Sequence, residues 1–216
     1  MKLLDLFCGA GGAAMGYHRA GFEVVGVDIH PQKNYPFEFV QADAMTFPLD
    51  GFDVIHASPP CQRYSALNRG LGNTDEKPDL LSATRNRLES SGVQWVLENV
   101  IGSPMGAVLL CGSMFGLNVR RHRLFESTVF IWGQQCRHSV YPTPIDVSGT
   151  GSFQHSPRKT KTGGKGRKPK SLDEARALMD MEWSDRRGIS QAIPPAYTEY
   201  IGRQIMAALT TPEPGR

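Results

Sequence analysis

The chain has 216 residues, a net charge of +3 and a hydrophobic fraction of 40%. This length supports one large domain, or one domain with a small appendage, and no apolar run is as long as a membrane span. Glycines follow the first apolar run at once, so we expect no signal peptide. The four cysteines show no paired spacing, which favours reduced thiols in a cytoplasmic protein.

One short segment has the spacing of half a metal site. Cys136-Arg137-His138 offers a thiol and an imidazole two residues apart. No second pair with ligand spacing accompanies it, so the sequence predicts no zinc and no other metal.

Positive charge is concentrated in one segment, residues 157–170, which contains no acid. Its basic residues are Arg158, Lys159, Lys161, Lys165, Arg167, Lys168 and Lys170. These seven charges exceed the net charge, so the remainder of the chain is net negative. The segment is either a solvated, disordered loop or the contact surface for a polyanion, and both descriptions can hold for the free protein.

The first 28 residues predict a strand, a glycine turn, a helix and a second strand. These elements span residues 2–7, 8–12, 13–20 and 23–27, with Gly21 ending the helix. Gly9 and Gly11 allow close approach of a ligand to the backbone, and helix amides point into the same space. Asp28 follows Gly9 by nineteen residues, where an acid can accept hydrogen bonds from ribose hydroxyls. The pattern indicates a nucleoside cofactor without saying which one.

A third strand is predicted at 38–41, and Asp43 follows it. At this strand end, the carboxylate could accept a hydrogen bond from an adenine amine. It could equally cap the turn toward Phe47, and the sequence leaves both roles open.

Cys61 follows a predicted strand at 52–55 and two prolines, Pro59 and Pro60. The prolines stiffen the corner, just past the carboxyl end of a strand, where open α/β sheets bind ligands. A thiol held there can act as a nucleophile, although a lone cysteine is more often an inert core residue.

Glu98 stands at the end of the next predicted strand, 95–97, after a helix at 79–90. A right-handed crossover would make these two strands parallel neighbours, with Glu98 and Cys61 at the same edge. A carboxyl group in a dry pocket has a raised pKa and can donate a proton. The alternative is a surface glutamate. The alternation of strands and helices predicts an α/β fold with a doubly wound, mostly parallel sheet, on which a last helix at 195–209 packs.

Five motifs in this order resemble those of the cytosine-C5 methyltransferases. The matching segments are Asp5-Leu6-Phe7-Cys8-Gly9-Ala10-Gly11-Gly12, Pro60-Cys61-Gln62, Glu98-Asn99-Val100, Arg121-His122-Arg123 and Gln191-Ala192-Ile193-Pro194-Pro195. Val119 replaces the glutamine expected two residues before Arg121, and Ser190-Gln191 replaces the usual Gly-Asn. The matches cover residues 1 to about 125 and 189–209.

The resemblance implies a Rossmann-like, S-adenosylmethionine-dependent DNA methyltransferase with these site residues. Catalysis would use Cys61 as nucleophile on carbon 6, Glu98 at ring nitrogen 3, Arg123 at the position-2 carbonyl and Arg121 in support. The cofactor would contact Phe7, Gly9, Ala10, Gly11, Gly12, Asp28, Ile29, Asp43, Ala44 and Pro60. DNA would contact Gln62, Arg63, Ser65, Asn68, Arg69, Asn99 and the basic residues of 157–170. The 62–78 loop would close over a flipped cytosine as a lid, unless it is only a solvated loop.

The resemblance also divides the chain into two parts. Residues 1–125 with 189–216 would form the catalytic and cofactor-binding domain, and 126–188 a small target recognition region, where a Ser171-x-x-Glu174 capping box starts a helix. The expected protein is a monomeric, cytoplasmic enzyme of bacterial or phage type that acts on double-stranded DNA, as in restriction-modification. Three alternatives stay open: a transfer RNA methyltransferase, a DNA-binding module without turnover, and a nicotinamide-dependent enzyme.

Overall fold

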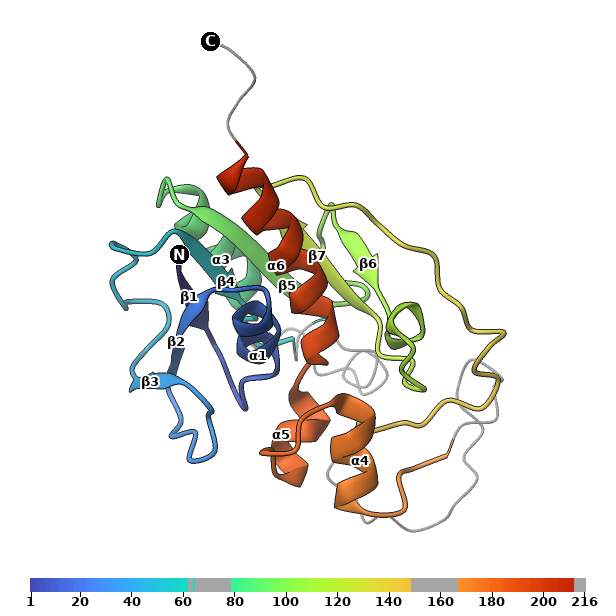
Figure 1. Ribbon diagram of the computed structural model, residues 1–216. Helices are drawn as coiled ribbons and strands as arrows, with labels where there is room; N and C mark the ends of the chain where they lie inside the picture. The colour runs from blue at the N-terminus through green and yellow to red at the C-terminus, as the bar shows by residue number, and fades with distance from the viewer. Residues whose placement is uncertain (62–63, 65–78, 149–166, 212–216) are drawn as a thin grey trace.

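The computed structural model describes residues 1–61, 64, 79–148 and 167–211. Within these residues seven strands form one sheet, in the order β3-β2-β1-β4-β5-β7-β6 (Figure 1). The five parallel strands are β1 (Lys2–Leu6), β2 (Glu23–Asp28), β3 (Glu38–Gln41), β4 (Val54–Ala57) and β5 (Gln94–Val100). The antiparallel strands are β7 (Arg123–Ser127), which pairs with β5, and β6 (Val108–Leu110), which pairs with β7. The predicted doubly wound, mostly parallel sheet is confirmed.

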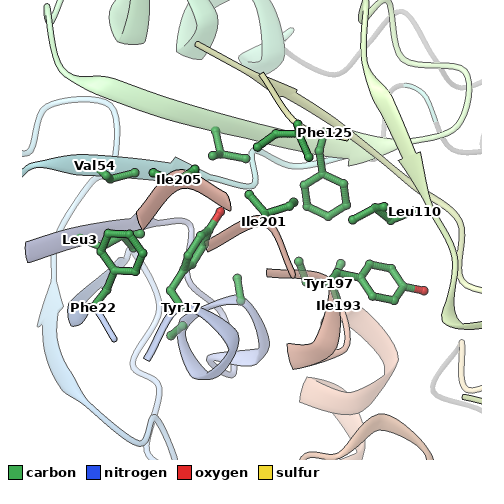
Figure 2. Packing of buried hydrophobic residues seen from close by; sticks show 14 of the residues in the cluster. Leu3, Tyr17, Phe22, Val54, Leu110, Phe125, Ile193, Tyr197, Ile201 and Ile205 are labelled. Atoms are coloured by element: carbon green, nitrogen blue, oxygen red, sulfur yellow. The ribbon is translucent and has the colours of Figure 1, made fainter. Parts of the chain in front are cut away.

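Helices cover both faces of this sheet. Helices α1 (Gly12–Arg19) and α6 (Pro195–Thr210) pack on one face, and α3 (Leu80–Glu89) packs on the other. Successive strand residues point to opposite faces, so Leu3 and Val54 join the α1–α6 core (Figure 2), whereas Leu4 and Ile55 join the α3 core. Burial on both faces explains why these strands are almost continuously apolar.

Helices α1 and α6 are in close contact over the face of the sheet that includes Leu3 of β1. A Cβ on Gly16 of α1 would lie 2.1 Å from both the Pro195 carbonyl oxygen and Thr198 Oγ1 of α6. The hydroxyl of Thr198 also donates to the Ala13 carbonyl oxygen at 2.8 Å. The helices therefore touch backbone to backbone, and α6 returns the chain to the sheet as expected.

Three smaller elements complete the described fold: the 3-10 helix η1 (Gly112–Phe115), which packs in the α1–α6 core, and the helices α4 (Leu172–Met179) and α5 (Arg186–Gln191). Figure 1 places α4 and α5 together, near the end at which α6 begins. The Ser171 half of the predicted capping box is present, because its side chain accepts the Glu174 amide at the start of α4, whereas the Glu174 carboxylate accepts the Lys170 amide. In the described part of the chain, no helix is long and apolar enough to cross a membrane.

Some predicted boundaries were wrong. The strand expected at 52–55 lies at Val54–Ala57, and the strand expected at 95–97 continues to Val100. The second extends because antiparallel β7 supplies partners beyond the point where β4 ends. Glu98 therefore lies inside β5, one residue past the last residue that pairs with β4. The sequence analysis also did not predict β6, η1, β7 or α5.

Candidate active site

The glycine turn after β1 presents backbone groups at the edge of the sheet. Phe7, Gly9 and Gly11 have φ angles of 58°, 50° and 79°, in the left-handed region that glycine tolerates best. A Cβ on Gly9 would meet no described atom within 4 Å, which leaves room for a ligand. Trp183 Nε1 donates to the Ala10 carbonyl oxygen at 2.8 Å, so the segment between α4 and α5 contacts this turn.

Asp28, at the end of β2, faces the same turn. Its Oδ2 accepts the Gly9 amide at 3.0 Å, and its Oδ1 accepts the His30 amide at 2.9 Å. The next residue, Ile29, is 60% exposed. An acid beside an exposed apolar side chain suits a nucleoside, because one can accept from ribose hydroxyls while the other contacts the base. The described residues therefore fit the predicted cofactor.

The other expected cofactor residues have structural roles of their own. Asp43 Oδ1 accepts the Met45 amide at 2.8 Å, so the turn-capping role is present, and contact with an adenine remains a prediction. The Ala44 side chain is buried in the α3 core, so Ala44 can offer a ligand only its backbone. Pro60 is exposed.

The turn that carries Cys61 is braced from β5. Asn99 Nδ2 donates to the Pro59 carbonyl oxygen at 3.0 Å, and Asn99 Oδ1 accepts the Ser103 hydroxyl at 2.8 Å. Asn99 is fully buried. Its amide braces the nucleophile turn and has no exposed atom, so its expected contact with DNA stays a prediction that this geometry does not support. Cys61 itself is partly exposed.

Glu98 is a buried acid in contact with an arginine. Its carboxyl is 7% exposed, and Arg123 Nε lies 2.9 Å from Oε1. Burial raises the pKa of Glu98, which outweighs the lowering by Arg123, Ser58 and Arg121. A raised pKa is what a proton donor needs near neutral pH.

Arg121, two residues before β7, and Arg123, the first residue of β7, have different partners. Arg121 is 7% exposed and donates through Nη2 to the Ser190 carbonyl oxygen at 2.7 Å, and the Tyr197 hydroxyl donates to the Arg121 carbonyl oxygen at 2.6 Å. Burial lowers the pKa of Arg121 to about 9, with a further contribution from the charge of Arg123. Arg121 thus ties β7 to α5 and α6, while Arg123 faces Glu98.

The two departures from the family motifs lie next to these arginines. Val119 is buried against Met181 and Ile189, so the residue that replaces glutamine belongs to the core. Ser190 contributes its backbone carbonyl to Arg121.

The Cys61 thiol lies within electrostatic reach of these groups. Burial raises its pKa, and the negative charge of Glu98 raises it further, whereas Arg123 and Arg121 lower it. The net result is that the pKa of the Cys61 thiol lies above its ordinary value in the free protein. We expected positive neighbours to assist ionisation. They are present, but burial outweighs them.

A buried polar chain that the sequence analysis missed leads to Glu98. The Tyr17 hydroxyl and His56 Nδ1 are 3.0 Å apart, and His56 Nε2 and Ser58 Oγ are 2.9 Å apart. Ser58 in turn hydrogen-bonds Glu98. The available signal was a histidine in an otherwise apolar strand, two residues before a serine, directly ahead of the prolines.

The predicted DNA contacts are only partly described. Outside the described residues lie Gln62, Arg63, Ser65, Asn68, Arg69, Arg158, Lys159, Lys161 and Lys165. Of the remainder, Arg167 is ion-paired with Glu174, and Lys168 Nζ lies 2.8 Å from Asp146 Oδ2. These two side chains bind acids of the same chain, so a phosphate would have to displace them. The Lys170 residue is exposed.

Part of this chain is similar in sequence to known DNA methyltransferases. Residues 1–102 match the family model for C-5 cytosine-specific DNA methylases. Type II methyltransferase M.NgoMIV of Neisseria gonorrhoeae is 33% identical over 110 residues, which cover 46% of this chain and 35% of the relative. M.HgiGI of Herpetosiphon aurantiacus is 32% identical over 92 residues, which cover 35% of this chain and 73% of the relative. The chain thus spans about a third of the length of M.NgoMIV.

Solved structures extend the likeness of fold to almost the whole chain. A putative DNA modification methyltransferase encoded within an E. coli prophage aligns with a TM-score of 0.63 at 17% identity, covering 98% of this chain and all of that one. The Dnmt2 methyltransferase of S. pombe aligns with a TM-score of 0.61 at 12% identity, covering 98% and 100%. The predicted family and fold are confirmed, and the chain belongs to the C-5 cytosine-specific DNA methylases.

Proposed function

We propose that this protein transfers a methyl group from S-adenosylmethionine to carbon 5 of cytosine in double-stranded DNA. The observation that carries the proposal is the shared electrostatic environment of Cys61, Glu98 and Arg123. The turn that carries Cys61 follows β4, and the glycine turn follows β1. These two strands pair as far as Leu6 and Ala57, so the two turns begin side by side. A module that only binds DNA has no need of a thiol and a buried acid at this edge.

The cofactor supplies an electrophilic methyl group carried on a sulfonium. The turn from Phe7 to Gly12 would hold it through backbone groups, including those of Ala10. Asp28 would accept hydrogen bonds from the ribose hydroxyls, Ile29 would contact the adenine, and Asp43 would accept from the adenine amine.

The protein must make carbon 5 of cytosine nucleophilic. The Cys61 thiolate forms a bond to carbon 6 and breaks the carbon 5–carbon 6 double bond. Glu98 gives a proton to ring nitrogen 3, so the displaced electron pair becomes available at carbon 5. Carbon 5 then bonds to the methyl carbon as the methyl–sulfur bond breaks. A water molecule would then take the carbon-5 proton as the thiolate leaves carbon 6, and ring nitrogen 3 would return its proton to the Glu98 carboxylate, which restores the ring.

The Glu98–Arg123 contact couples the protonation of Glu98 to the protonation of Cys61. When Glu98 holds its proton, it no longer raises the pKa of Cys61 and no longer neutralises Arg123. Arg123 and Arg121 then favour the thiolate, so the acid form of Glu98 and the nucleophilic form of Cys61 occur together. Arg123 would also hold the position-2 carbonyl.

The DNA-binding parts of the proposal come from the family. A cytosine inside a duplex must leave the stack before Cys61 can reach it, and the 62–78 loop would close over the flipped base. Residues 126–188 would recognise the target, although α4 and α5 also contact the glycine turn and Val119. The lysines and arginines of 157–170 would contact phosphates. We further propose a monomeric, cytoplasmic enzyme of the restriction-modification type.

Duplex DNA containing 5-fluorocytosine tests the reaction. Fluorine cannot leave as a proton does, so methyl transfer should trap the Cys61–carbon 6 bond as an adduct stable to denaturation. The Cys61→Ala variant should form none. Absence of the adduct in both proteins, with cofactor present, would contradict the proposal. Preferential methylation of transfer RNA over duplex DNA would instead support the RNA alternative.

A further inference from the structure

Four side chains far from the Cys61 turn in sequence converge on one point. They are Cys111, His122, Cys136 and His138, whose ligand atoms all lie within 4.8 Å of one another. Cys111 Sγ is 3.4 Å from His138 Nε2, and Cys136 Sγ is 3.5 Å from His122 Nε2. The two imidazole rings are nearly perpendicular, at 81°, with centroids 5.1 Å apart.

The β6–β7 pairing explains how this cluster forms. Leu110 of β6 pairs with Arg123 of β7. The next position outward therefore brings Cys111 and His122 opposite each other, although η1 and the residues after it separate them in sequence. After β7 the chain returns to this position, where Cys136 and His138 contact His122 and Cys111. The sequence analysis excluded zinc because it found no second pair, and the fold supplies that pair.

The sulfur–nitrogen distances in this cluster match tetrahedral coordination of one ion better than they match a disulfide or a single hydrogen bond. Zinc–sulfur and zinc–nitrogen bonds of about 2.3 and 2.05 Å give a sulfur–nitrogen edge of about 3.6 Å in a tetrahedron. The two sulfur–nitrogen distances of 3.4 and 3.5 Å are close to this value and involve different atoms, as two opposite edges would. A Cys111–Cys136 disulfide would leave both imidazoles unexplained, and one thiol–imidazole hydrogen bond would not require the second pair.

The Cys111 sulfur has a polar neighbour besides the two imidazoles. It is buried and lies 3.3 Å from Ser113 Oγ. Metal ligands commonly have an outer hydrogen-bonding partner of this kind, which orients them toward the ion.

We propose that Cys111, His122, Cys136 and His138 bind one structural Zn²⁺. Two thiolates and two imidazoles fill all four positions, so no position is open for a substrate, as in structural rather than catalytic zinc sites. The ion would tie residues 136–138 to the β6–β7 pair. Within the described range 79–148, residues 128–144 belong to no helix or strand, so this segment gains most from a crosslink. His122 lies between Arg121 and Arg123, so the ion would also hold the start of β7 beneath the active site.

The metal content of the full chain, expressed without a tag, tests this proposal. Elemental analysis by mass spectrometry should find about one zinc per chain. Cys136→Ser should lose it, whereas Cys61→Ser should keep the zinc and lose methyl transfer. Replacing zinc with Co²⁺ should give the visible absorption of a tetrahedral thiolate site, with thiolate-to-metal charge transfer.

Two further measurements keep the proposal falsifiable if Cys136→Ser does not fold. His138→Cys provides three thiolates and one imidazole, another zinc-binding set, and should retain the ion. A chelator should remove zinc from the wild type and lower its Tm, and added Zn²⁺ should restore it. Less than about one zinc in ten chains, with a Tm that does not respond to Zn²⁺, would overturn the proposal. So would a Cys111–Cys136 disulfide in the unreduced protein.

Discussion

Replacing Glu98 with glutamine should make Cys61 more acidic while making the enzyme slower. The negative charge of Glu98 raises the pKa of the thiol, and glutamine has a similar size without that charge. The variant keeps Arg123 and Arg121, which both lower the thiol pKa. Glutamine cannot deliver a proton to ring nitrogen 3, however, so carbon 5 is not activated.

Coulomb's law sets the size of the effect. Two unit charges about 6 Å apart, the outer limit of the range in which a neighbouring charge strongly shifts a pKa, interact by about 3 kcal/mol at an effective dielectric constant of about 20, equivalent to about two pKa units. Loss of the full Glu98 charge sets the upper limit of the effect, so we expect Glu98→Gln to lower the Cys61 pKa by about one to two units.

The rate of alkylation by iodoacetamide reports this pKa, because only the thiolate reacts. Peptide mass spectrometry across a pH series would follow Cys61 separately from the other cysteines. Cys8 is an internal control, since burial raises the pKa of its thiol strongly and it should stay unreactive in both proteins. An unchanged or higher Cys61 pKa in Glu98→Gln would refute the electrostatic argument.

Three further predictions concern helix packing, acid stability and the turn that carries Cys61. Gly16→Ala should lower the free energy of unfolding by about 1–3 kcal/mol, because its Cβ would lie 2.1 Å from α6 atoms, whereas Gly106→Ala meets no described atom within 4 Å and should be close to neutral in denaturant unfolding. Burial lowers the pKa of His56 from 6.5 to about 3, so the unfolded chain binds the extra proton between these values. Stability should therefore fall as pH falls through this window, by up to about 1.4 kcal/mol per pH unit, and His56→Gln should flatten that slope. Asn99→Ala should release Pro59 and slow adduct formation with 5-fluorocytosine DNA more than it weakens DNA binding.

Clear outcomes would contradict each of these. Equal stabilities for Gly16→Ala and Gly106→Ala would mean that α1 and α6 are not in backbone contact. An acid-unfolding slope that His56→Gln leaves unchanged would assign the pH dependence to other groups. Weaker DNA binding by Asn99→Ala, at an unchanged adduct rate, would restore Asn99 to the DNA contacts.

Local patterns predicted the parallel half of the sheet well. The apolar strands, Gly21 after α1 and the Ser171 cap each depend on neighbouring residues, and each is present. The antiparallel part was missed because a three-residue strand such as β6 has too few residues for periodicity to show. Leu209 continues the apolar stripe of α6 but is 37% exposed, because the helix extends past the core at its end.

Order along the chain named Cys61, Glu98 and the two arginines as candidate site residues, and their catalytic roles stay predictions. The sequence did not predict the electrostatics of these residues. The Glu98–Arg123 contact and the His56–Ser58 chain depend on side chains brought together by strand pairing. The position of Asn99 also depends on strand pairing, because its buried amide reaches from β5 to the Pro59 carbonyl oxygen. Motif order alone had suggested that Asn99 contacts DNA.

The packing of α6 against α1 has a consequence for synthesis of the protein. Ile201 and Ile205 complete the core that Leu3 and Val54 begin (Figure 2). While α6 is still inside the ribosome, that face of the nascent sheet is uncovered. The Arg121 carbonyl likewise awaits the hydroxyl of Tyr197. A partly translated chain should therefore expose this apolar face to chaperones, and the core beneath the candidate site should be complete only once residues 195–210 have emerged.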